Sequence, residues 1–393
     1  MEAHALALEK NADGIELLRI LTRKGLSEYA SNSLQNLGVT DNLTMEKCYL
    51  CDGKFNFISH FVEIINQKIQ GISFNSYLVG IKIPSQILER EDELRSQFGV
   101  KWGETIRNEF SREIGKEFSK DTKKEVDYKR PDLVVTINPF TEEISFQINP
   151  IFVYGRYRKL EAGIPQSKMI CMACGGKGCP KCKGLEKIYG KSVEEFISTP
   201  FLKASGGNDE KFHAAGREGA DTRILGSGRP FVLEIKNPVR RDIDLIEIAV
   251  TIKNESEGKI EVDDLKFCLK ETVRTLKAHR QLKKTYRLEV LFENPLSEDE
   301  LKQLEEQVVN YNLPEKSGIQ TDKGLVVKQE KQIYESKVNR LTQNSVEIII
   351  TSMGGQYIKE LIGKKGEVES TLSQFIKNPI KKMGFDIVDI SWV

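Results

Sequence analysis

Alternation of apolar and polar residues predicts strands in both halves of the chain. Successive side chains of a strand point to opposite faces of a sheet, so such alternation indicates one buried face and one more exposed face. Proline and glycine punctuate several of these runs, as expected where a strand ends in a turn. The pattern predicts strands at 77–83, 132–137, 144–148, 231–235, 286–292, 344–351 and 386–392.

Apolar residues at helical spacing separate these strands. The spacing predicts a helical segment over 1–47, an amphipathic helix over 57–69 and charged helical structure over 87–118. Ser297 precedes three acidic residues and predicts a helix start, because its hydroxyl can cap free backbone amides. Mixed strands and helices in both halves predict an α+β protein.

Size and charge set broad limits on this protein. A chain of 393 residues exceeds one ordinary core, so it is expected to fold as two or three domains. The net charge is +1, so any contact with nucleic acid needs a local basic patch. The sequence has no apolar run long enough to cross a membrane and no secretory signal at its start. We therefore expect a cytoplasmic protein with no membrane partner.

The most basic segment, 151–191, is predicted to form a charged loop. Its aromatic residues interleave with cations, a pattern that suits contact with an RNA backbone and stacking on bases. A solvated surface loop is the alternative, although the excess of one sign favours binding. The candidate RNA-binding residues are Arg156, Arg158 and Lys159.

Cysteines within this segment have metal-ligand spacing. Two C-x-x-C pairs lie four residues apart, with glycines between them that allow the backbone to fold back. Four thiolates suit one tetrahedral zinc ion with a structural role. The ligands are predicted to be Cys171, Cys174, Cys179 and Cys182. A third pair, Cys48 and Cys51, could contribute instead, whereas Cys268 is predicted to be a core residue.

An aspartate, Asp221, stands in a glycine-rich segment among arginines, just before the strand at 231–235. Guanidinium groups can bind phosphate while the carboxylate reaches a reacting carbon, so we take Arg217 and Arg223 as substrate-binding candidates. The alternative is a surface turn with local ion pairs.

Two further motifs suggest other functions. The sequence from Ser205 to Asp209 resembles the phosphate loop of adenylating sulfur transferases, but proline interrupts the segment before it. The G-x-x-G sequence at 363–366 matches the RNA-clamping loop of KH domains, and a surface turn explains it equally well. Neither motif implies a nucleotide cofactor.

The segment around Asp221 resembles the catalytic motif of the archaeal and eukaryotic tRNA pseudouridine synthases that modify uridines 54 and 55 of the TΨC arm. The matching residues are Gly216-Arg217-Glu218, Asp221, Arg223, Leu225-Gly226, Gly228-Arg229-Pro230-Phe231 and Leu233-Glu234. Further matches are 154–160, 164–166, 192–195, Tyr286 and 355–360, so the resemblance covers about 48–393.

This resemblance implies a THUMP-containing, tRNA-binding domain followed by a pseudouridine synthase domain with a mixed, largely antiparallel sheet. It implies that Asp221 is the nucleophile and Lys359 its partner, and that Tyr286 and Tyr357 contact the target base. The reaction is an isomerisation, so no catalytic cofactor is expected. The implied partner is tRNA, bound by a monomer. The competing hypothesis is a non-catalytic tRNA-binding protein.

The expected organisation is a helical segment at 1–47, the THUMP-containing domain at 48–170, the zinc loop at 171–190 and the catalytic domain at 191–393. The chain departs from the family pattern at Gly219, where an acid is common, so Asp221 is the remaining candidate nucleophile. It also departs at 331–340, in a loop expected to grip tRNA.

Overall fold

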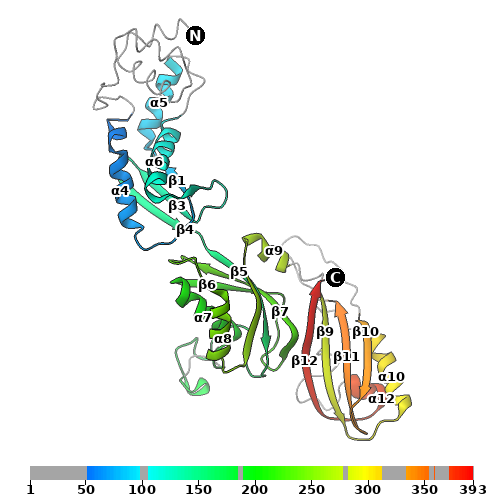
Figure 1. Cartoon of the computed structure of the whole chain (residues 1–393). Helices are drawn as coiled ribbons and strands as arrows, with labels where there is room; N and C mark the ends of the chain where they lie inside the picture. The colour runs from blue at the N-terminus through cyan, green and yellow to red at the C-terminus, as the bar shows by residue number, and fades with distance from the viewer. Residues whose placement is uncertain are drawn as a thin grey trace, which may run out of the picture. The chain divides into compact units, whose positions relative to one another are not determined.

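The computed structural model describes residues 51–97, 105–184, 189–277, 282–311, 333–353, 358 and 371–392 (Figure 1). Contacts divide them into two compact units, the first ending at Pro150 and including Lys236–Arg241, and the second holding the rest. The predictions for 1–47, Cys48, Tyr357, Lys359 and 363–366 lie outside the described residues.

The first unit is a four-stranded sheet covered by helices. Its strands are β1 (Ser76–Ile81), β2 (Glu125–Val126), β3 (Leu133–Asn138) and β4 (Glu143–Ile148), in the order β2-β1-β3-β4. β1 runs parallel to β2 and β3, whereas β3 and β4 form an antiparallel pair. The helices are η2 (Lys54–Phe57), α4 (Ile58–Lys68), α5 (Ser85–Gln97) and α6 (Ile106–Thr122).

Aromatic residues join α6 to the sheet of this unit. Tyr77 on β1 and Phe118 on α6 are both fully buried, with ring centroids 4.7 Å apart in an edge-to-face contact. The Tyr77 hydroxyl donates to the carbonyl oxygen of Gly115 at 2.7 Å, which satisfies its buried polar atom. Thr105 caps α6 by accepting from the Asn108 amide, as its sequence position favours.

The second unit is built on an eight-stranded sheet in the described part of the chain. The path is β10-β11-β9-β12-β7-β5-β8, with β6 paired to β7. The strands are β5 (Ile151–Lys159), β6 (Asp209–Ala214), β7 (Arg223–Lys236), β8 (Ile260–Cys268), β9 (Leu282–Phe292), β10 (Ile333–Arg340), β11 (Ser345–Met353) and β12 (Ile380–Trp392). β7 and β12 run parallel; the pairs β5–β7, β5–β8, β9–β11, β9–β12 and β10–β11 are antiparallel.

Helices pack on this sheet at several points. α7 contacts α8 beside the half of the sheet that holds β5 to β8, and α10 contacts β10 and α12 at the other half (Figure 1). The helices are η3 (Pro180–Cys182), α7 (Val193–Ser205), α8 (Leu245–Glu255), α9 (Lys270–Lys277), α10 (Glu298–Val309) and α12 (Thr371–Ile376). α10 begins where predicted: Ser297 and Glu300 form a reciprocal capping box.

Two sequence expectations differ from this fold. Residues 151–159 were expected in a charged loop of the first domain, but they form β5, a central strand of the second unit. The boundary between the units therefore falls at 150 and not at 170. Ser205 ends α7 and Gly206 is its left-handed C-cap, so the segment before Asp209 is a helix and not the strand that an adenylating phosphate loop requires.

Among the described residues, no helix is both long and apolar enough to cross a membrane.

Gly226 tests the packing of β7 against β12. Its φ is +52°, and a Cβ there would overlap the carbonyl oxygen of Val388. We expect Gly226→Ala to lower the free energy of unfolding by more than about 3 kcal/mol, because backbone strain and overlap add. The control is Gly258→Ala, at φ +77° with open space around it, which should cost only about 1 kcal/mol. Equal losses of unfolding free energy for the two variants, measured by urea denaturation, would show that β7 and β12 do not pack as described.

Candidate active site

Asp221 lies on a turn between two paired strands. β6 ends at Ala214, β7 begins at Arg223, and the Thr222 amide donates to the carbonyl oxygen of Gly219 at 3.3 Å. The Thr222 side chain is buried and its hydroxyl lies 3.5 Å from Asp221 Oδ1, whereas Asp221 itself is exposed. The turn, residues 215–222, therefore presents one carboxylate to solvent.

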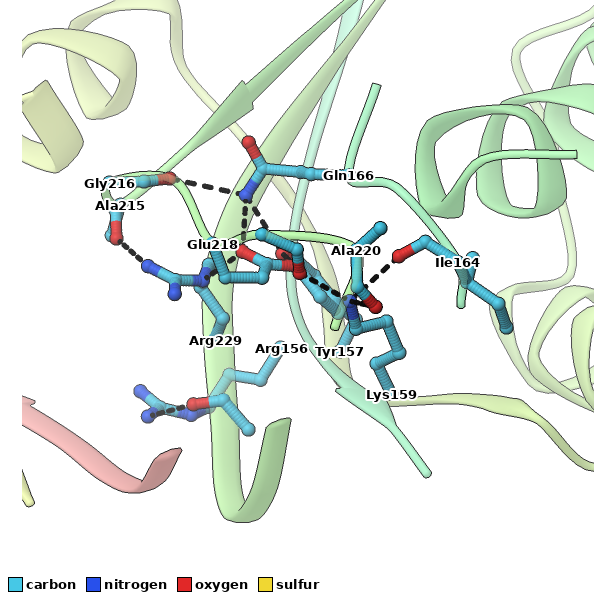
Figure 2. A network of polar contacts seen from close by, with 12 residues as sticks. Arg156, Tyr157, Lys159, Ile164, Gln166, Ala215, Gly216, Glu218, Ala220 and Arg229 are labelled. Atoms are coloured by element: carbon cyan, nitrogen blue, oxygen red, sulfur yellow. Dashed lines mark hydrogen bonds and ion pairs between the residues drawn. The ribbon is translucent and has the colours of Figure 1, made fainter. Parts of the chain in front are cut away.

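Lys159 fixes the backbone of this turn through hydrogen bonds. Its side chain is fully buried at the end of β5, and Nζ donates to the carbonyl oxygens of Ile164 at 2.7 Å, Gly219 at 3.0 Å and Ala220 at 3.3 Å (Figure 2). The last two carbonyls precede Asp221 directly. A buried ammonium needs such acceptors to offset its lost hydration. Lys159 thus fixes the backbone before Asp221, and it cannot contact RNA as predicted because its cation is enclosed by protein.

Glu218 anchors the same turn from the other side. Its carboxylate lies 3.0 Å from Nε of Arg229 and accepts hydrogen bonds from Tyr157 at 2.8 Å and Gln166 at 2.9 Å (Figure 2). Arg229 is fully buried, and its Nη1 donates to the carbonyl oxygen of Ala215 at 2.6 Å. Burial, with the nearby Glu218 charge, raises the pKa of Tyr157 well above its usual value, so Tyr157 is a neutral donor to Glu218.

The inner face of β9 contributes Lys284 and Tyr286 beside this anchor. They are two residues apart and therefore share one face of the strand. A Cβ added at Gly216 would lie 3.0 Å from Lys284 Nζ and 3.1 Å from Arg229 Nη1, which places both cations against the turn. Burial, assisted by the Arg229 charge, lowers the pKa of Lys284 to about 8.

Tyr286 is a buried aromatic residue with a neutral hydroxyl. Its ring stacks on Phe385 of β12 with centroids 5.5 Å apart. Burial raises the pKa of Tyr286 to about 12, so the phenol is protonated at neutral pH and cannot act as a base. Tyr286 shares its face of β9 with Lys284, whose Nζ lies against Gly216 of the turn.

Arg223 lies on the opposite face of the sheet from Tyr286. The register aligns Arg223, Asp386 and Arg287 in one row and Ile224, Ile387 and Tyr286 in the next. Arg223 donates from Nε and Nη2 to the two carboxylate oxygens of Asp386, both at 2.7 Å, and Arg287 adds a third contact at 3.0 Å. These contacts commit Arg223 to joining β7 and β12, in contrast to the predicted substrate contact.

Two other predicted RNA contacts are also engaged by protein. Arg156 Nη2 donates to the carbonyl oxygens of Gly228 at 2.9 Å and Ile390 at 2.6 Å. Arg158 pairs with Glu261 at 2.9 Å and Asp263 at 2.6 Å across the β5–β8 pair. Arg217, by contrast, is exposed and has no hydrogen bond or ion pair within the described residues, so it remains available to a ligand.

The sequence did not single out Gln166, Glu218 or Lys284 as site residues. Gln166 and Glu218 belong to the segments that matched the family, but their roles depend on a meeting of residues far apart in the chain. The one local signal is that Glu218 is an acid within a segment that is otherwise rich in glycine and arginine. Lys284 has no local signal, since two adjacent lysines suggest an exposed strand edge.

Four cysteine sulfurs converge in residues 167–184, which we call the cysteine loop. The Sγ atoms of Cys171, Cys174, Cys179 and Cys182 all lie within 4.8 Å of one another. The Sγ–Sγ separations are 3.9 Å for Cys171–Cys179, 3.8 Å for Cys174–Cys182 and 3.7 Å for Cys179–Cys182. Sulfurs about 2.3 Å from a tetrahedral ion are about 3.8 Å apart, so this donor set fits a metal such as zinc.

The local backbone supports this cluster. Gly175, Gly176 and Gly178 adopt positive φ values of 57°, 84° and 82°, as expected where glycines let the chain fold back. The Cys179 amide donates to Cys182 Sγ at 3.2 Å, which favours a thiolate there. Cys51 is instead buried in the core of the first unit. The predicted set of four sulfurs therefore meets without it.

Two family models match the chain. The model described as "Pus10, C-terminal" covers residues 152–391, and the model "Pus10 THUMP domain, archaeal" covers residues 61–138. The first begins where the second structural unit begins. These matches confirm the predicted fold class, in which a THUMP-containing unit is joined to a pseudouridine synthase unit.

Curated relatives extend over most of the chain. Identity to the tRNA pseudouridine synthase Pus10 of Methanocaldococcus jannaschii is 39% over 374 residues, which cover 94% of this chain and 79% of that protein. The protein of the same name from Methanothermobacter marburgensis is 36% identical over 87% of this chain and 86% of its own length. That from Thermofilum pendens is 34% identical, with coverage of 98% and 84%. A crystal structure of a pseudouridylate synthase also matches, with 15% identity, a TM-score of 0.24, and coverage of 64% of this chain and 70% of that one.

Lys159→Met tests the anchor beneath Asp221. The variant keeps most of the side-chain volume but leaves buried carbonyls without their cation, so we expect a loss of about 3 kcal/mol in unfolding free energy. Amide hydrogen exchange should accelerate within 215–222 in particular. The control is Lys203→Met, which removes an exposed lysine paired with Glu255 and should cost less than about 1 kcal/mol. Unchanged exchange in the turn would contradict the anchoring role.

Proposed function

Because the chain belongs to the Pus10 family, we propose that it is a tRNA pseudouridine synthase that isomerises uridine 54, uridine 55 or both in the TΨC arm. The observation that carries this proposal is the turn 215–222, which presents the exposed Asp221 carboxylate within the unit that the C-terminal model covers. The THUMP match in the first unit supports tRNA as the substrate. We expect a monomer that acts in the cytoplasm.

The reaction transfers the ribose C1′ from N1 to C5 of the same uracil. The Asp221 carboxylate attacks C1′ as a nucleophile, which breaks the N1–C1′ bond, forms an aspartate ester at C1′ and releases uracil as an anion. The uracil then turns so that C5 faces C1′, the C5–C1′ bond forms as the aspartate ester breaks, and the C5 proton is lost while N1 gains one. Oxidation state is unchanged, and no cofactor takes part.

The target uridine must first leave its stack, at a cost of a few kcal/mol. Tyr286 supplies an aromatic side chain at the site, and its neutral hydroxyl can donate to a uracil oxygen. Arg217 is exposed on the Asp221 turn and can bind a flanking phosphate. By family resemblance, Tyr357 contacts the base from a second side and Lys359 pairs with Asp221.

Asp221→Asn tests the nucleophile. An amide cannot form the ester, so pseudouridine formation in a TΨC-arm transcript should fall by at least about a thousand-fold while tRNA affinity stays within a few-fold. The matched control is Asp242→Asn, an exposed acid in the same unit, which should retain full activity. Activity that survives in Asp221→Asn would exclude this mechanism. A wild-type protein that binds tRNA but forms no pseudouridine would favour a non-catalytic role.

We further propose that the cysteine loop binds one structural zinc ion. Elemental analysis should find about one zinc per chain, and Cys174→Ser or Cys182→Ser should lower that content strongly. Proteolysis within 167–184 should then become faster, while the remaining core keeps its melting temperature within a few degrees. Cys268→Ser serves as the control, since Cys268 lies outside the cluster. Full zinc retention in the Cys182 variant would refute the ligand set.

A further inference from the structure

The basic segment 151–191 holds two sets of cations that differ in their surroundings. Those on β5, which were predicted to contact RNA, are engaged by protein carbonyls or carboxylates, as described above. The cysteine loop carries a second set of four exposed lysines, whose ammonium groups make no hydrogen bond or ion pair within the described residues. They are Lys168, Lys177, Lys181 and Lys183.

Some other lysines of this unit have carboxylate partners. Lys203 pairs with Glu255 at 3.0 Å, Lys253 with Glu261 at 2.9 Å and Lys259 with Glu257 at 2.8 Å. Other exposed lysines, such as Lys302 and Lys377, have no such partner within the described residues. Residues 162–184 contain no acid at all. The positive charge of the cysteine loop is thus uncompensated by its own segment.

The segment that leads into the loop is joined to the Asp221 turn. Gln166 donates to Glu218 at 2.9 Å and to the carbonyl oxygen of Gly216 at 3.2 Å, and the Gly163 amide donates to the carbonyl oxygen of Ala220 at 2.8 Å. The Val193 amide donates to the carbonyl oxygen of Pro165 at 3.0 Å, which ties α7 to the same segment. The loop therefore starts from a segment that is fixed to the turn of Asp221.

Neutralisation of a metal centre does not account for these lysines. Four thiolates around a divalent zinc ion carry a net charge of minus two, so four ammonium groups leave an excess. The Cys179 amide donates to Cys182 Sγ, and within the described residues no lysine donates to any of the four sulfurs. The lysines are free for an external polyanion.

We infer that the cysteine loop is a phosphate clamp for the tRNA whose uridine reaches Asp221. The metal folds the loop, and Lys168, Lys177, Lys181 and Lys183 bind the RNA backbone. Met172, with 93% of its surface exposed beside them, offers an apolar contact for a ribose or base face. This inference rests on the proposed function for the identity of the RNA.

The test replaces the four lysines together by glutamine and measures affinity for a TΨC-arm transcript between about 50 and 200 mM salt. The plot of log affinity against log salt should become shallower by about 2 to 4, and affinity at low salt should fall at least about ten-fold. The turnover number at saturating RNA should change little. The matched control makes the same charge change at acid-paired sites, Lys203, Lys253, Lys259 and Lys266, and should keep most of the slope.

An unchanged slope in a variant that retains its zinc would overturn the clamp. Equal losses of affinity and of slope in the two quadruple variants would also overturn it, because net charge alone would then explain the effect. If the quadruple variant loses zinc, the double variant Lys168→Gln with Lys183→Gln is used in its place. These two lysines lie outside the C-x-x-C pairs, one on each side. The double variant should show half the expected change in slope. Failure of the proposed function gives a different result from failure of the clamp. The wild-type protein would then form no pseudouridine, while the salt slopes of the loop variant and the control variant would still differ.

Discussion

A carboxylate buried against a guanidinium group, Glu218 with Arg229, is the constraint on which the rest of the site depends. Removing two charges from water costs several kcal/mol each, so the pair is tolerable only where other groups complete its hydrogen bonds. Tyr157 and Gln166 do so for Glu218, and the Ala215 carbonyl does so for one nitrogen of Arg229. The pair therefore fixes β5, the segment after it, the turn and β7 at one point, three residues before Asp221.

Alternation along the chain was enough to predict most strands, because one face of each is more buried than the other. β5 was missed for a physical reason. Its cations Arg156 and Lys159 suggest a solvated loop, yet their charges are satisfied by carbonyls from segments some 60 to 230 residues away, as with Gly219 and Ile390. A sequence shows which side chains carry charge, but burial and pairing depend on long-range contacts.

The same limit explains the mixed outcome for the site. Asp221 could be singled out locally, as one acid among glycines and arginines. Tyr286 came from family resemblance alone, since an aromatic residue on a strand is ordinary. The role of Arg223 depends on Asp386, 163 residues later, and on a register that places both on the face opposite Tyr286. No nearby residue reveals that register.

The charge around Gly216 links folding to chemistry. Lys284 and Arg229 both approach the α-carbon of Gly216, and Glu218 pairs with Arg229. Because the folded pKa of Lys284 is about 8, below its ordinary value, its burial costs stability below about pH 8, and the cost is relieved as the pH rises above that value. At neutral pH, Lys284 and Arg229 thus carry one more positive charge than Glu218 balances, and this excess does not favour folding. In the proposed mechanism uracil leaves the ribose as an anion, and a preorganised cation stabilises negative charge that develops nearby. The unfavourable burial of Lys284 is therefore consistent with a site shaped for bond cleavage more than for stability.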